Sequence, residues 1–105
     1  MKESVEYQIF VGCNDPQVNE EIVSEQELRE MVAGFFERKK IDFSMLSTRG
    51  GYMHTYGGFV EENSICVSII GDPDFDIIGL AKSLAMYMNQ ESALVTRNVI
   101  TTTFQ

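Results

Sequence analysis

Residues 64–90 read SICVSIIGDPDFDIIGLAKSLAMYMNQ and join a strand pattern to a helix pattern. Ser64 to Ile70 is uncharged and nearly continuous in Ile, Val and Cys, which predicts a strand in the centre of a sheet. Asp72–Pro73 follows as the expected cap and first position of a helix. Ile77 to Gln90 then has helical spacing of apolar residues, with Lys82 as its only charged side chain. This stretch therefore predicts a buried strand that leads into a helix.

The N-terminal part of the chain has the same strand-then-helix order. Every second residue from Val5 to Val11 is apolar, which predicts a strand. Ser24 and Glu27 have the spacing of a capping box, in which each side chain satisfies a backbone donor of the other residue. A single apolar stripe with helical spacing follows, made of Leu28, Met31, Val32, Phe35 and Phe36. A first helix is expected here.

Glycine pairs divide the region between the two helices. Gly57–Gly58 separates two strand-like runs and predicts a hairpin turn. Gly50–Gly51 is then expected to form a bulge or bend within a long second strand. Ala93 to Phe104 is rich in Val, Ile and Thr and predicts a final strand.

The resulting order is strand, helix, strand, strand, helix, strand. With right-handed crossovers and short hairpins, this order predicts an α+β, ferredoxin-like split β-α-β fold. The expected sheet has four antiparallel strands, with the first and third in the centre and both helices on one face.

Composition limits the classes of function. With 105 residues and 44% hydrophobic content, the chain is expected to form one ferredoxin-like domain over residues 1–105. A net charge of -8 argues against direct nucleic-acid binding and against an anionic membrane surface. No apolar run reaches the roughly 18 residues needed to span a bilayer, and the N-terminus lacks the apolar core of a signal peptide. A cytoplasmic protein is expected.

The second helix has two groups of apolar residues. Leu80 and Tyr87 lie away from the face expected to contact the sheet, among uncharged neighbours. Such a surface favours an interface in a homo-oligomer, although the two side chains could instead pack under a loop or the last strand. The face expected to contact the sheet consists of Ile77, Ile78, Ala81, Leu84, Ala85 and Met88.

A second candidate site lies before the Gly57–Gly58 turn. His54 shares a strand face with Tyr52 and Tyr56 if the alternation continues, and Arg49 lies nearby. Aromatic rings and one guanidinium could bind a small anionic, planar ligand such as a nucleotide. The alternative is a hairpin with aromatic cross-strand pairs and a solvated histidine.

Few residues offer chemistry for catalysis. Cys13 lies in a loop after the first strand and would need a base, for which His54 is the only histidine available. Cys66 is expected to pack in the core, and the two cysteines match no metal-binding spacing, so no metal or cofactor is expected. Glu61–Glu62 is interpreted as part of a solvated strand rather than a carboxylate pair for acid-base work.

Four short segments resemble a group of small, uncharacterised bacterial, phage and mobile-element proteins with a ferredoxin-like core. These segments are Tyr7–Asp15 (YQIFVGCND), Arg49–Tyr52 (RGGY), Glu62–Val67 (ENSICV) and Asn89–Val95 (NQESALV). The resemblance implies the same fold and a phage or mobile-element origin, and it brings no catalytic residue.

These observations favour a noncatalytic, oligomeric binding protein. Its partner would be a host protein or a nucleotide-like ligand that it sequesters or senses. The alternative is a small enzyme that uses Cys13 or His54.

Overall fold

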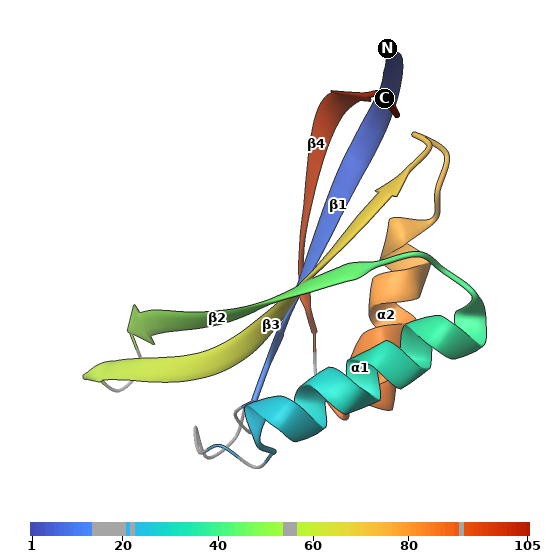
Figure 1. The fold of residues 1–105 in the computed structure, drawn as a ribbon. Helices are drawn as coiled ribbons and strands as arrows, with labels where there is room; N and C mark the ends of the chain where they lie inside the picture. Colours follow the sequence, from blue (N-terminus) through green and yellow to red (C-terminus); the bar gives the residue numbers. More distant parts are fainter. Residues whose placement is uncertain (14–20, 22, 54–56, 91) are drawn as a thin grey trace.

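A computed structural model of the chain describes residues 1–13, 21, 23–53, 57–90 and 92–105. Its elements follow the expected order of strands and helices (Figure 1). The bounds are β1 Lys2–Gly12, α1 Glu25–Lys39, β2 Ser44–Met53, β3 Phe59–Gly71, α2 Ile77–Tyr87 and β4 Leu94–Thr102. The predicted α+β, ferredoxin-like fold is confirmed.

The sheet has the strand order β2-β3-β1-β4, with antiparallel pairing throughout. The first and third strands are therefore central, as expected from their apolar content. Odd-numbered residues of β1 and β3 are buried in one cluster with residues of both helices. The opposite side of the sheet, marked by the even-numbered residues of β1 from Ser4 to Gly12, is called the helix-free face below.

Tyr7 connects the core to the start of the second helix. Its side chain is 1% exposed, and its hydroxyl donates a hydrogen bond to the Asp72 carbonyl at 3.1 Å. Its ring lies 5.9 Å from that of Phe75, measured between centroids. The buried phenol is thus satisfied at its polar end, as a buried tyrosine requires.

The two helices differ in how well their starts could be predicted. Ser24 caps α1, because its hydroxyl accepts from the Glu27 backbone N–H at 3.1 Å. The prediction that Asp72–Pro73 starts the second helix is wrong, since α2 begins at Ile77 with Asp76 as its cap. Residues 72–75 instead close a turn, in which the Phe75 N–H donates to the Asp72 carbonyl at 3.1 Å.

The buried face of α2 also differs from the prediction. Leu80 is 8% exposed and belongs to the core, whereas Ile78 is 56% exposed. The exposure expected for Leu80 is therefore wrong. Tyr87 is 44% exposed, and its ring lies between Phe35, at 5.6 Å, and the Arg38 guanidinium, at 5.2 Å. These contacts hold α2 against α1.

The β2–β3 hairpin projects away from the two helices (Figure 1). The radius of gyration is 14.8 Å, larger than the value of about 13 Å for a compact chain of this length. A bulge or a bend is predicted at Gly50 and Gly51, and because the pairing register runs without interruption through both residues, the bulge is wrong. Gly57 and Gly58 have φ angles of 90° and 86°, which only glycine adopts readily, and they form part of the turn as predicted.

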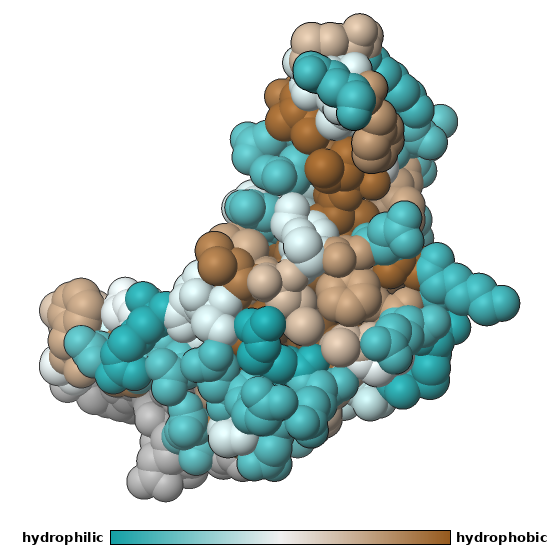
Figure 2. Space-filling model, viewed as in Figure 1, coloured by the Kyte–Doolittle hydropathy of each residue, from teal (hydrophilic) through white to brown (hydrophobic). Residues whose placement is uncertain are grey.

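The surface is uneven in polarity. Figure 2 shows apolar side chains gathered on the arm where β1, β3 and β4 extend beyond α1, and mostly hydrophilic ones over α1 itself. Exposed apolar residues of these strands include Ile70 and Val99, at 58% and 59% exposed. Over the described ranges, no helix is long and apolar enough to cross a membrane.

The burial of Leu80 gives a direct prediction about stability. Leu80→Ala is expected to lower the free energy of unfolding by about 2–5 kcal/mol, because it leaves a cavity in the core. Met86→Ala, in the same helix but 81% exposed, is the matched control and should change it by less than about 0.5 kcal/mol. Urea denaturation measures both. If Leu80→Ala left the free energy of unfolding unchanged and altered the oligomeric state measured by light scattering, Leu80 would instead belong to an interface between subunits.

Candidate functional site

Polar side chains on the helix-free face bond across the strands. The Ser68 hydroxyl donates to the Glu6 carboxylate at 3.3 Å, and the Thr96 hydroxyl donates to the Gln8 side-chain oxygen at 3.3 Å. Thr96 pairs directly with Gln8, and Ser68 lies diagonally from Glu6, so each bond joins side chains that the register puts on one face. The helix-free face therefore carries these polar groups beside exposed apolar side chains such as Leu46, Ile70 and Leu94, whereas the opposite face packs in the core.

Glu62 has an unusual position on this face. A β-carbon added to Gly12 would collide with the Glu62 carboxylate, so this carboxylate fills the space over Gly12. Gly50 pairs directly with Glu62 on the other side, and nothing lies within 4 Å of the position of a β-carbon there. The carboxylate thus leans toward β1 and leaves open space over β2. Glu62, Gly12 and Gly50, with the hydrogen-bonded hydroxyls of Thr48 and Ser64, form what we call the Glu62 site.

Tyr52 lies next to this site. It follows Gly50 by two residues in β2 and therefore shares its face, and it is 40% exposed. Tyr52 is the only one of the four predicted ligand-binding residues that the structure places on the helix-free face of the described hairpin. His54 and Tyr56 lie outside the described residues.

Arg49 lies on the opposite face, so the structure does not bring it onto one face with Tyr52. Its Nη2 and Nε atoms donate to Glu61 Oε2 at 2.6 and 3.1 Å, and its Nη1 donates to Asn63 Oδ1 at 2.9 Å. The guanidinium is engaged with its own hairpin. An anion bound between Arg49 and Tyr52 would have to contact both faces of one strand.

Cys13 is poorly suited to act as a nucleophile. Its side chain is 0% exposed and its thiol is free. Burial, together with the smaller effects of the nearby carboxylates of Glu21, Glu62 and Glu25, raises its pKa to about 11. The thiolate is the reactive form, so almost none is present near neutral pH.

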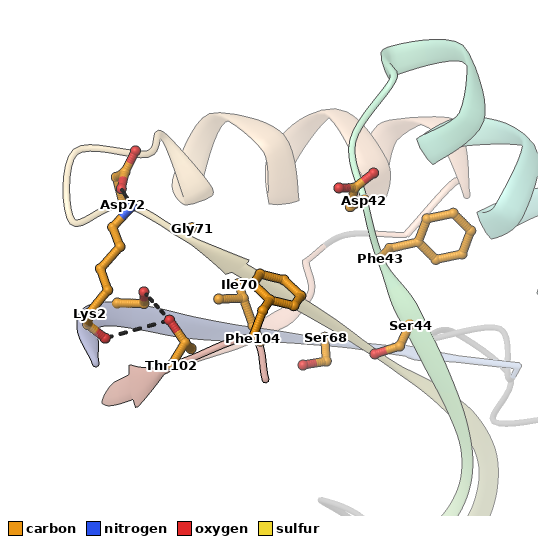
Figure 3. A pocket seen from close by; sticks show the side chains of 11 residues that line it. Lys2, Asp42, Phe43, Ser44, Ser68, Ile70, Gly71, Asp72, Thr102 and Phe104 are labelled. Atoms are coloured by element: carbon orange, nitrogen blue, oxygen red, sulfur yellow. Dashed lines mark hydrogen bonds and ion pairs between the residues drawn. The ribbon is translucent and has the colours of Figure 1, made fainter.

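A broad hollow lies near the chain termini (Figure 3). This terminal cavity has a volume of about 540 Å³ and is lined by residues that include Asp42, Ser44 and Phe104. Lys2 forms an ion pair with Asp72 at 3.7 Å at one end of it. Figure 3 shows the Phe43 ring directed away from the hollow. One lysine and two aspartates, Lys2, Asp42 and Asp72, line this cavity, and Lys2 is paired with Asp72.

Metal binding has no support in the described part of the chain. No group of three or more His, Cys, Asp or Glu side chains there is placed to hold a metal ion.

Comparison with known proteins finds similarity in structure. No protein-family model and no curated protein sequence matches the chain. A solved structure described as a phage SAM lyase in complex with S-methyl-5′-thioadenosine matches with a TM-score of 0.65 and 24% identity, over 94% of this chain and 90% of that one. A phage SAM lyase in the apo state matches with a TM-score of 0.65 and 23% identity, over 98% and 93%. At these identities the comparison establishes a shared fold.

These similarities correct the main functional expectation. The prediction of a noncatalytic binding protein is wrong, because the similar structures are of an enzyme. The alternative prediction, a small enzyme, has better support. The ligand in the similar structure, S-methyl-5′-thioadenosine, is uncharged, whereas the ligand expected from the sequence is anionic. The phage description agrees with the resemblance drawn from the sequence.

Glu62 is the residue that the sequence interpretation missed. The sequence interpretation groups it with Glu61 in a solvated strand after the Gly57–Gly58 turn. The glycines at positions 12 and 50 are a signal in the sequence. Their position beside Glu62 can be recognised only when the pairing register of β1, β3 and β2 is known.

The environment of Cys13 predicts slow alkylation. Because its pKa is raised to about 11, the rate of reaction with iodoacetamide should stay low at pH 8 and rise only as the pH exceeds about 9. Mass spectrometry of the Cys13 peptide in folded protein measures this rate, with urea-unfolded protein as the control. Rapid alkylation at pH 7 in the folded state would contradict the assigned burial and revive Cys13 as a nucleophile.

Proposed function

We propose that this protein is an enzyme that cleaves S-adenosylmethionine and releases S-methyl-5′-thioadenosine. The observation that carries the proposal is the Glu62 carboxylate, seated over Gly12 on the helix-free face with open space over Gly50. The similarity to structures of a phage SAM lyase over nearly the whole chain supports the same reaction class.

The charge of the protein suits this substrate. S-adenosylmethionine carries a sulfonium, an ammonium and a carboxylate, and so has one net positive charge. A protein of net charge -8 attracts such a cation over long range. The product S-methyl-5′-thioadenosine is neutral, so the attraction is lost when the reaction is complete. Electrostatics therefore favour substrate capture and do not hold back this product.

The proposed reaction needs the substrate to be held in the correct geometry, and it needs no nucleophile from the protein. Release of S-methyl-5′-thioadenosine breaks the bond between sulfur and the aminobutyryl chain, and the electron pair of this bond stays on sulfur. The chain carbon gains a bond to an oxygen of the substrate's own carboxylate, which closes a five-membered lactone without added water or proton transfer. Holding the chain in this folded geometry is the main task of the site.

The role of Glu62 follows from where charge changes during the reaction. Positive charge on sulfur decreases toward the transition state, so a carboxylate at sulfur would stabilise the substrate more than the transition state. The ammonium group keeps its charge throughout. We therefore assign Glu62 to the ammonium group, which it holds so that the substrate carboxylate faces the reacting carbon. Tyr52, on the same face, offers an aromatic surface for the adenine.

Glu62→Gln separates binding of the ammonium group from binding of the nucleoside. The change is expected to lower kcat/KM for S-adenosylmethionine by about 100-fold, because the chain is no longer held in its reactive geometry. The dissociation constant for S-methyl-5′-thioadenosine, which has no ammonium group, should change by less than about threefold. Chromatography of the released nucleoside and calorimetry measure the two quantities.

Two further variants sharpen this test. Gly12→Ala pushes the Glu62 carboxylate out of its place without removing it, and should reduce turnover while leaving the fold intact. Asp42→Asn removes a carboxylate from the terminal cavity and should leave turnover unchanged. Loss of activity in Asp42→Asn but not in Glu62→Gln would move the site to the terminal cavity. No release of S-methyl-5′-thioadenosine by the wild-type protein would refute the proposed function.

The biological setting and assembly state extend the proposal. A phage or mobile-element origin, and action in the cytoplasm of a host that makes S-adenosylmethionine, fit the proposed substrate. Expression in bacteria would then lower the cellular S-adenosylmethionine pool, and Glu62→Gln would not. The homo-oligomer expected from the sequence also stays a proposal, with Tyr87 as a partly exposed candidate contact that light scattering of a Tyr87 variant can examine.

A further inference from the structure

We propose that Arg49 is a positioning residue that braces the Glu62 site from the opposite face of the β2–β3 hairpin. This inference rests on the proposed function, since it assigns to Arg49 the support of the carboxylate that holds the substrate. Arg49 itself does not contact the substrate.

The hairpin needs such a brace at this point. Gly50 pairs with Glu62, and Gly51 pairs with Glu61, so two successive positions of β2 offer no side chain to their partners. Cross-strand side-chain pairs stabilise a sheet, and glycine in the interior of a strand weakens it. The same glycines that leave open space beside Glu62 thus remove support from the strand that carries it.

Arg49 spans the unsupported stretch. It pairs directly with Asn63 and also reaches diagonally to Glu61, and these are the residues immediately before and after Glu62. Alternation places Arg49, Glu61 and Asn63 on one face and Glu62 on the other. The planar guanidinium can donate in two directions at once, which a lysine ammonium on a flexible stem does less rigidly. Both neighbours of Glu62 are therefore fixed by one side chain.

Hydrogen bonds also connect Asn63 to the end of β1, next to Gly12. The Asn63 amide donates to the Glu21 carboxylate at 3.0 Å, and the Asn63 carbonyl accepts from the Cys13 backbone N–H at 2.9 Å. Cys13 directly follows Gly12, over which the Glu62 carboxylate lies. Asn63, which accepts a hydrogen bond from Arg49, is therefore also bonded to the end of β1 where the Glu62 carboxylate lies.

The test compares two substitutions of Arg49 with a matched control. Arg49→Gln is expected to lower kcat about tenfold with KM changed by less than about twofold, because the substrate still binds but is held less well. Arg49→Lys keeps the positive charge but loses the planar guanidinium that donates in two directions, so it should retain only part of the wild-type activity. Arg97→Gln makes the same charge change at an exposed position of the edge strand β4 and should behave as wild type.

Backbone motion provides a readout that does not depend on turnover. The ¹⁵N order parameter of the Glu62 amide should be near 0.85 in the wild type, as for rigid backbone, and should fall toward 0.6 in Arg49→Gln. Arg97→Gln should leave it unchanged.

The outcomes separate this inference from the proposed function. If wild type and Arg49→Gln cleave S-adenosylmethionine equally well with equal order parameters, the brace is refuted and the proposed function stands. Full recovery in Arg49→Lys would also refute it, because charge alone would then suffice. If the wild type shows no cleavage, the proposed function fails, and an order parameter that stays near 0.85 in Arg49→Gln refutes the brace independently.

Discussion

The central strand β1 buries every second side chain beneath the two helices. Val5, Tyr7, Ile9 and Val11 are each at most 2% exposed, and each contacts the core shared by both helices. A shift of one residue in this strand would turn all four toward the helix-free face. Because β1 pairs with both β3 and β4, its register determines which residues of those strands share a face. The arrangement of the whole sheet depends on this alternation.

The two faces of the sheet consequently carry different tasks. Apolar packing fills the face under the helices, while the helix-free face holds a series of polar contacts that ends at Glu62. The distal part of the β2–β3 hairpin, residues 49–53 and 59–63, projects beyond the buried cluster, so its two faces have no core to hold them. In this part of the hairpin, polar contacts take the place of apolar packing. The hydrogen bonds from Arg49 to Glu61 and Asn63 are examples. The candidate site therefore lies where the core ends.

The sequence predicted the fold because its strongest patterns are local. Alternation in β1 and the Ser24 cap of α1 both depend on a few residues, and both are present in the structure. The start of α2 is harder to predict, since Asp72 and Asp76 are both suitable caps. In the structure Asp72 closes a turn whose Phe75 ring lies against Tyr7, and Asp76 caps the helix. The buried face of this short, mostly apolar helix was ambiguous for the same reason.

The candidate site could not be found in this way. Glu62 and Gly12 are 50 positions apart, and their contact depends on the pairing of β1 with β3. Arg49 carried a recognisable charge, but the face on which it lies depends on an uninterrupted register through Gly50 and Gly51. Local patterns report which elements form, whereas the site is made by how three of them align.

The separation of the two faces has a consequence for how this sequence can change over generations. The helices contribute to the core only through their apolar stripes, and positions such as Ile78 and Met86 are more than half exposed. Substitutions can therefore accumulate over much of the helical surface without reaching the helix-free face. Two genes with this fold could diverge until little overall identity remains and still encode the same reaction, so sequence distance alone is a poor guide to functional distance among them.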